Sequence, residues 1–109
     1  MMYAIAFNLD TDILKKSYND DESWQNAYND IAKFLRDKGF ERIGSDVYFG
    51  NHNVDMVTCQ TAVQRMVMKY DWFAPSVHNI RMLRIEDIND LTPAIELALE
   101  IKDRIHNEV

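Results

Sequence analysis

Strict alternation of bulky apolar residues with small or polar ones near the start most constrains how this chain can fold. The bulky side chains stand at every second position, at Tyr3, Ile5, Phe7 and Leu9. A period of two is the signature of a β-strand with two distinct faces. Ala4, Ala6 and then polar Asn8 occupy the other face. The bulky face requires a core, the alanine face lets a second layer approach closely, and we expect any active site at the end of this strand.

Size and composition predict a single domain over residues 1–109, with a core over about 1–86 and a C-terminal helix over about 92–107. Apolar residues make up 47% of the chain, which is enough for a packed core. A chain this short gains stability by dimerising. The net charge of −6 argues against a surface that coats nucleic acid broadly, but it allows a small local basic site.

Cysteine use and hydropathy indicate a cytoplasmic protein. One cysteine, Cys59, allows no internal disulfide, which fits a reducing compartment. No apolar run approaches the roughly 20 residues that span a bilayer, so we expect no membrane association. The three histidines share no metal-ligand spacing, and Cys59 stands in an apolar helical stripe, so no zinc site is indicated.

Periodicity along the rest of the chain predicts alternating strands and helices. We expect helices over about 23–38, 54–70 and 92–107, and strands over 40–43, 47–49 and 77–85. Residues 11–21 are expected to form a loop with one helical turn at 13–16, and residues 71–76 a connection. The order βαββαβ is the ferredoxin-like pattern of an α+β fold, with two helices on one face of a four-stranded antiparallel sheet. The other face is open unless the last helix or a second subunit covers it.

Capping residues support the predicted helix ends. Ser23 or Asp21 can cap the first long helix, and Gly39 follows its last turn, where a left-handed residue is favoured. Asn53 is the expected cap of the second helix, and Thr92 that of the last.

Asn8 and Asp10 are the first candidates for a functional site. Their spacing of two places both on one face of the strand, where Asp10 can bind a cation or handle a proton. The alternative is structural, because Asp10 can equally cap a turn that contains Ile13.

The predicted hairpin and the strand after it supply further candidates. Ser45 and Asp46 are either turn formers or catalytic groups, and Tyr48 either packs in the core or offers a ring on which a base stacks. Arg81 and Arg84 lie three residues apart and therefore point to opposite faces of a regular strand. Each arginine either pairs with an acidic neighbour, such as Glu86 or Asp87, or contacts phosphate.

Four stretches together resemble one protein family. They read MYAIAFNLDTDILKK, WQNAYNDI, GFERIGSDVYFGN and WFAPSVHNIRMLRIEDINDLTPAI, and the resemblance to the virulence-associated protein D (VapD) family extends to about residue 99. That family is similar in fold to the small CRISPR-associated ferredoxin-fold nucleases. The resemblance implies a homodimer formed through sheet packing and an endoribonuclease activity. Several members of the family are toxins of bacterial toxin–antitoxin pairs, which implies an antitoxin protein as a partner.

The chain departs from the family at its central position. The family's first strand typically reads AFDL, and the resemblance assigns catalysis to that aspartate, which Asn8 replaces here. An asparagine cannot act as a carboxylate base and is a weaker ligand for a hard cation. Asn8 is therefore an introduced substitution that silences a nuclease, a natural residue whose role Asp10 has taken over, or the mark of a protein that only binds.

Two other motifs also differ. The family's SVRDIR appears as SVHNIR, so His78 and Asn79 replace an arginine and an aspartate while Arg81 is kept. The family's GSVY appears as SDVY, with Ser45 and Asp46 in its first two positions. A single inactivating change would not alter these positions, so natural divergence is the more economical explanation.

The expected reaction is cleavage of a phosphodiester bond in single-stranded RNA. Asp10 would orient a water, a ribose 2′-hydroxyl or a cation, and His78 would serve as acid or base. Arg81 or Arg84 would stabilise charge on the phosphate. A divalent cation such as Mg²⁺ would need carboxylates from both chains of a dimer. The alternative function is a non-catalytic homodimeric module that binds RNA or a partner protein.

Overall fold

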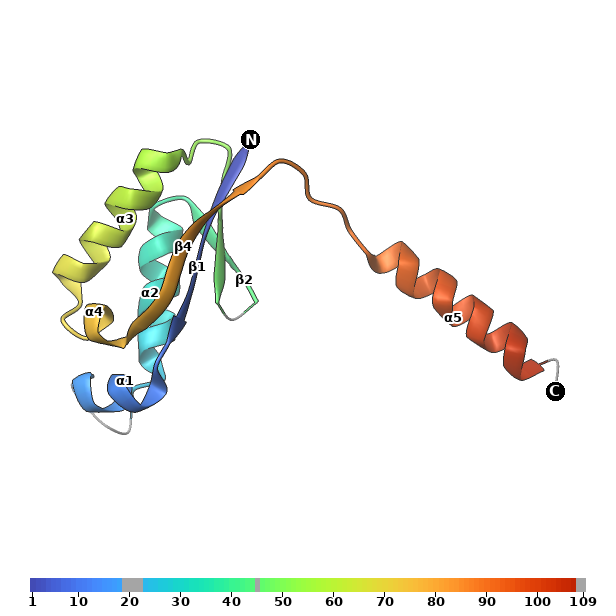
Figure 1. Ribbon diagram of the computed structural model, residues 1–109, viewed down its shortest axis with the longest axis horizontal. Helices are drawn as coiled ribbons and strands as arrows, with labels where there is room; N and C mark the ends of the chain where they lie inside the picture. Colours follow the sequence, from blue (N-terminus) through green and yellow to red (C-terminus); the bar gives the residue numbers. More distant parts are fainter. Residues whose placement is uncertain (19–22, 45, 108–109) are drawn as a thin grey trace.

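A computed structural model describes residues 1–18, 23–44 and 46–107 of the chain (Figure 1). The elements follow the order β1 (Met2–Leu9), α1 (Thr11–Ser17), α2 (Asn26–Asp37), β2 (Phe40–Ile43), β3 (Val47–Gly50), α3 (Met56–Lys69), α4 (Phe73–Ser76), β4 (Val77–Ile85) and α5 (Thr92–Asn107). The four strands form one sheet in the order β2-β3-β1-β4, and all neighbours are antiparallel. This confirms the α+β, ferredoxin-like prediction.

The core lies between the bulky face of β1 and the helices that cover it. Ile5 and Phe7 are only 1% and 4% exposed. The ring of Phe7 stacks on Tyr48 of β3 at 5.6 Å between centroids and meets the edge of Phe73 at the same distance. Helix α2 contributes Ile31, which has no exposed surface. The alternating pattern of β1 therefore produces the buried face that it predicts.

The helices differ from the predictions at α1, at α4 and at the start of α3, and α2 begins at Asn26 where about residue 23 was predicted. The expected turn at 13–16 is a longer helix, α1, and the expected connection at 71–76 contains the short α4. Helix α3 is capped by Asp55, whose carboxylate accepts from the Thr58 amide at 2.8 Å. The prediction of Asn53 as the cap was wrong, because the Asn53 amide donates to the side chain of Asn51 in the turn before the helix.

The caps of α2 and α5 also differ in detail. Gln25 stands at the N-cap position of α2 and makes no side-chain capping hydrogen bond, so neither predicted residue occupies that position, and Asp21 lies outside the described residues. Gly39 follows α2 with φ of +95°, the left-handed conformation that the sequence predicts. Thr92 is itself the first residue of α5, and its amide donates to the side chain of Asp90 at 2.9 Å.

None of the helices in the described part of the chain packs on the second face of the sheet (Figure 1). Residues paired across antiparallel strands share a face, so Phe49 and Leu83, the partners of Ala4, lie on this open face, as does Val47, the partner of Ala6. Helix α5 does not cover it. Figure 1 shows α5 at the end of an extended connection that leads away from the sheet, and no residue of α5 is buried. None of the described helices is both long and apolar enough to cross a membrane.

Candidate functional site

A β-bulge where β1 meets β4 organises the candidate site. Ala6 pairs with Arg81 and Asn8 pairs with His78, so two residues of β4 stand opposite Phe7 alone. One of these two, Asn79, has φ of +52°, a conformation that asparagine tolerates better than most residues.

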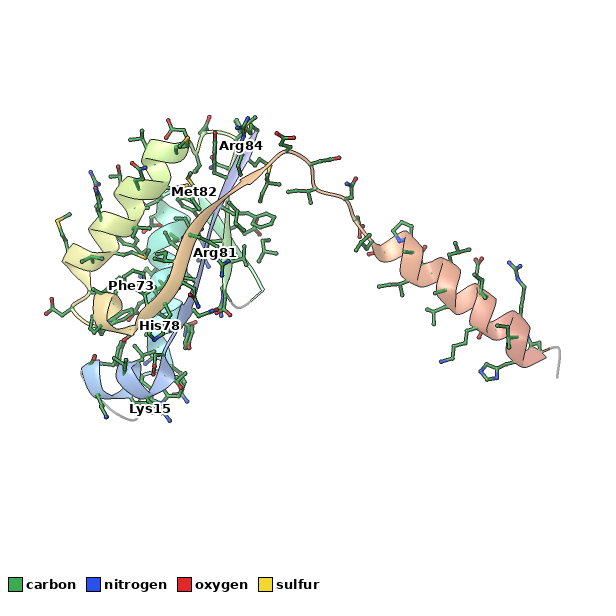
Figure 2. All side chains as sticks on the ribbon, viewed as in Figure 1. Lys15, Phe73, His78, Arg81, Met82 and Arg84 are labelled. Atoms are coloured by element: carbon green, nitrogen blue, oxygen red, sulfur yellow. The ribbon has the colours of Figure 1, made fainter. Side chains whose placement is uncertain are left out.

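The bulge changes which side chains share a face. A regular strand places residues three apart on opposite faces, but His78 and Arg81 pair with two residues of the same face of β1, Asn8 and Ala6. The extra residue therefore brings a histidine and an arginine onto the open face beside Asn8. Figure 2 shows His78 at the end of β4 that meets α1 and Arg81 farther along the strand.

Asp10 joins the site from the end of β1. The strand ends at Leu9, and Asp10 caps α1 by accepting from the Ile13 amide at 3.0 Å through Oδ1. Its Oδ2 lies 3.3 Å from Nε2 of His78. The hydrogen bond from Ile13, supported by His78, holds the pKa of Asp10 below 3.8. Asp10 therefore caps a helix, as the structural interpretation of this residue predicts. Its second carboxylate oxygen also contacts His78, a candidate catalytic residue.

Asp46 closes the site on the side of β3. Its backbone carbonyl accepts from the Phe7 amide at 3.1 Å, which fixes the hairpin turn against β1. A shallow hollow of about 240 Å³ on the open face is lined by Asn8, Asp46 and Arg81 together with Ala6, Phe7, Val47 and Leu83. Ser45 lies outside the described residues.

A second hollow that Asn8 also lines contains two residues that sequence reasoning missed. Its volume is about 450 Å³, and Tyr28 and Arg42 line it with Asn8, Leu9 and Asp46. The Arg42 guanidinium lies 6.0 Å from the centre of the Tyr28 ring. Burial and the charge of Asp46 raise the pKa of Tyr28, and Arg42 opposes the shift. In the sequence, only the basic residue Arg42 in the hairpin pointed to this hollow. Tyr28 could not be predicted as part of it, because α2 and the hairpin turn are far apart in the sequence.

Arg81 and Arg84 lie on opposite faces, as predicted. Arg84 pairs with Tyr3 at the far end of β4, and its Nε donates to the sulfur of Met1. Among the described residues, neither arginine forms an ion pair with a carboxylate. Both side chains are exposed, but only Arg81 lies beside Asn8.

Tyr48 lies in the core. It is 1% exposed and stacked on Phe7, so no base can stack on its ring in this structure, and the packing alternative describes its position. Cys59 is also buried, and desolvation raises the pKa of its thiol, which disfavours the nucleophilic thiolate. In the part of the chain that the structure describes, no three His, Cys, Asp or Glu residues are placed to hold a metal ion.

Comparison with known proteins gives several close relatives, although no family model matches the chain. "Endoribonuclease VapD 2" of Riemerella anatipestifer is 46% identical over 94 residues, which cover 86% of this chain and 99% of that protein. "Endoribonuclease VapD homolog" of Helicobacter pylori is 40% identical over 98 residues, covering 90% and 100%. "Endoribonuclease VapD" of Dichelobacter nodosus is 40% identical over 97 residues, covering 89% and 100%. Such identity over nearly the whole length of each relative confirms the resemblance seen in the sequence motifs, and the chain belongs to the VapD family.

Proposed function

We propose that this protein is an endoribonuclease that cleaves single-stranded RNA at the Asn8 end of its open sheet face. The observation that carries the proposal is the contact between Asp10 and His78. This contact lies beside Asn8, on the same sheet face as Arg81. The names of the relatives, each an endoribonuclease VapD, support the same activity.

The arrangement suits attack by a ribose 2′-hydroxyl on the neighbouring phosphorus. His78 is 49% exposed, so the substrate can reach it. With the Nε2 proton donated to Asp10, Nδ1 is free to accept the 2′-hydroxyl proton. The new O2′–P bond forms as the P–O5′ bond breaks, and the protonated histidine returns the proton to the 5′-oxygen. The products are a 2′,3′-cyclic phosphate and a 5′-hydroxyl.

Arg81 supplies the positive charge that this reaction needs. Negative charge builds up on the phosphate oxygens in the transition state. The Arg81 guanidinium forms no ion pair with a carboxylate of the described residues, so it is well suited to stabilise that charge. The amide of Asn8 can donate a hydrogen bond to the same phosphate, but it cannot take up a proton. Asn8 in place of the family's aspartate is therefore expected to weaken cleavage.

A divalent cation such as Mg²⁺ fits this face only in part. Asn8 and Asp46 line the same hollow and offer an amide oxygen and a carboxylate, which is fewer than the oxygen ligands that Mg²⁺ takes. A magnesium site here would therefore need carboxylates from a second copy of the chain. We further propose a homodimer with an antitoxin protein as a partner, in line with the family, and a cytoplasmic location, in line with the single cysteine Cys59.

The proposal is tested by incubating the purified protein with end-labelled single-stranded RNA and identifying the product ends. We expect slow cleavage that leaves 2′,3′-cyclic phosphates and is lost in His78→Ala and Arg81→Ala. Arg84→Ala is the matched control, because it removes another exposed arginine from the far end of the same strand. If neither the chain as given nor Asn8→Asp cleaves any RNA, the nuclease proposal fails.

A second candidate function is a non-catalytic homodimeric module that binds RNA or a partner protein. Asn8 and the net charge of −6 favour it, because the first removes a carboxylate and the second weakens attraction to nucleic acid. Saturable RNA binding without cleavage by both the given chain and Asn8→Asp would support this alternative.

A further inference from the structure

A cluster of basic side chains lies where α2 meets α3, on the helix side of the sheet. Its members are Lys38, which follows α2, and Arg65 and Lys69 of α3, and we call them the basic cluster. Within the described part of the chain, none of the three side chains forms an ion pair with a carboxylate. Positive charges gathered in this way on a chain with a net charge of −6 indicate an anionic ligand.

The ring of Phe34 holds the basic cluster together across the two helices. Nζ of Lys38 and Nζ of Lys69 each lie 5.5 Å from the centre of this ring. Arg65 and Lys69 are four positions apart on α3, so they are neighbours on one helix face, with Cβ atoms about 5–6 Å apart. The three cations therefore form one patch, with a spacing comparable to that of successive phosphates in a nucleic-acid strand.

A hollow of about 310 Å³ opens beside the basic cluster. Its lining consists of Lys38, Asp55, Val57, Thr58, Thr61, Ala62 and Arg65. The carboxylate of Asp55 caps α3, because its Oδ1 accepts from the amide and from the hydroxyl of Thr58, both at 2.8 Å. Guanidinium, ammonium and threonine hydroxyl groups are all donors to phosphate oxygens. The hollow therefore suits a phosphate group better than a neutral ligand.

A line of aromatic contacts leads from the basic cluster toward the candidate cleavage site. The ring centre of Phe34 lies 6.2 Å from that of Tyr70, Tyr70 stacks on Trp72 at 4.8 Å, and Trp72 meets Tyr18 at 5.5 Å. Tyr18 follows α1, the helix whose N-terminal cap contacts His78. Phe34 and Tyr70 are only partly buried, so bases can stack on the solvent side of their rings.

Helix α1 adds positive charge along the same route. Lys15 and Lys16 stand in its last turn, and both are exposed. Figure 2 shows Lys15 on α1, at the end of the molecule where β4 carries His78. An RNA strand that leaves the open face at His78 therefore meets further lysines before it reaches the helix side of the sheet.

We propose that the basic cluster binds phosphate groups of the RNA at a distance from the cleaved bond. The inference rests on the RNA cleavage proposed above and adds a second contact surface on the opposite side of the sheet. The strand passes from the open face around α1 to Lys69, Arg65 and Lys38. Such a surface supplies a local attraction for RNA that the net charge of the chain does not, and it favours strands long enough to reach both sides.

Fluorescence anisotropy with a labelled 2′-O-methyl RNA of about 20 nucleotides tests the proposal. This RNA lacks the free 2′-hydroxyl, so its binding is measured without cleavage. The unaltered full chain is compared with Arg65→Gln/Lys69→Gln over a series of salt concentrations. We expect about 10- to 30-fold weaker binding by the variant at about 100 mM salt. The slope of log affinity against log salt should be smaller by about 1.4, because each lost phosphate contact of a single strand removes about 0.7.

Lys33→Gln/Arg36→Gln is the matched control. It removes the same two positive charges from exposed positions of α2, and neither residue is among the described residues that line the hollow. Its affinity for RNA should stay within about twofold of that of the unaltered protein. Thermal melts of both double variants check that the fold is retained. An equal loss of RNA binding in the two double variants would be a general effect of charge and overturns the proposal.

Arg81→Gln separates the basic cluster from the candidate cleavage site, because Arg81 lies on the open face. Loss of RNA binding in Arg81→Gln but not in Arg65→Gln/Lys69→Gln would confine the RNA to the open face and overturn the second surface alone. Binding that depends on Arg65 and Lys69 upholds the second surface even if the protein cleaves no RNA. Poly-glutamate of matched length is added as a competitor. If it displaces the RNA at equal charge concentration, the basic cluster takes acidic protein segments and the assignment to RNA is overturned.

Discussion

Nε2 of His78 lies 3.3 Å from Oδ2 of Asp10, and 68 positions of the chain separate the two residues. The same carboxylate caps α1 through its other oxygen. The start of a helix therefore fixes the orientation of a candidate catalytic histidine, and the two roles of Asp10 can be separated by mutation.

Asp10→Asn should keep the helix cap and lose the charge. Asparagine is as good a cap as aspartate, so the melting temperature at pH 7 should change little. RNA cleavage should fall about 10- to 100-fold, because the amide holds the His78 imidazolium less well than a carboxylate does. Asp10→Ala should lower both the melting temperature and the activity. Cleavage by Asp10→Asn at the rate of the unaltered protein would show that the pair has no part in the reaction.

The stability of the folded chain should report the Asp10 contacts at acid pH. The folded-state pKa is held below 3.8, so the stabilising contribution of the carboxylate is present above pH 3.8 and is lost as the pH falls through the folded value. Urea unfolding at pH 5 and pH 3 should show a smaller loss of stability for Asp10→Asn than for the unaltered protein. An equal loss in the two proteins would contradict the assignment.

Asn8→Asp should raise the rate of RNA cleavage by at least about tenfold. The new carboxylate would stand beside His78 and Arg81 on the open face, where it can accept a proton or bind a cation. Initial rates on one labelled RNA at equal protein concentrations give the comparison. Asn51→Asp, a change of the same kind in the loop after β3, should leave the rate unchanged.

Tyr18 should make the protein sensitive to alkaline pH. Its hydroxyl donates to Asp30 at 2.8 Å, and burial together with this carboxylate raises its pKa to about 12. The stabilising contribution is complete below pH 10, where the unfolded tyrosine is also protonated, and is lost as the pH rises from 10 to 12. Tyr18→Phe should therefore lose less stability than the unaltered protein between pH 9 and pH 11, as measured by urea unfolding.

Gly50→Ala should destabilise the fold by about 1–3 kcal/mol through overpacking. An added Cβ would lie 2.7 Å from Cβ of Val54 and 3.0 Å from the carbonyl oxygen of Tyr3, and β3 sits too firmly in the sheet to move away. The unfolding free energy in urea measures the effect. A variant as stable as the unaltered protein would mean that the residues after β3 shift easily.

The sequence alone determined the fold of the body and the family. The alternation from Tyr3 to Leu9 specified a strand with a buried face, and Gly39 marked the end of α2. Motifs such as SVHNIR are enough to indicate the VapD family, and the relatives confirm it. These features are readable because periodicity and turn chemistry act between residues close in the sequence.

Only the tertiary structure decided which residues of the site come together. A spacing of three predicts opposite faces for His78 and Arg81, but the bulge at Asn79 places them on one face. The position of Tyr28 beside Asp46 also depends on packing between distant segments. The physical reason is that the pairing register of the strands decides which side chains meet. One extra residue in a strand changes the register of all the residues that follow it in that strand, and a single residue is hard to detect in a hydrophobic pattern.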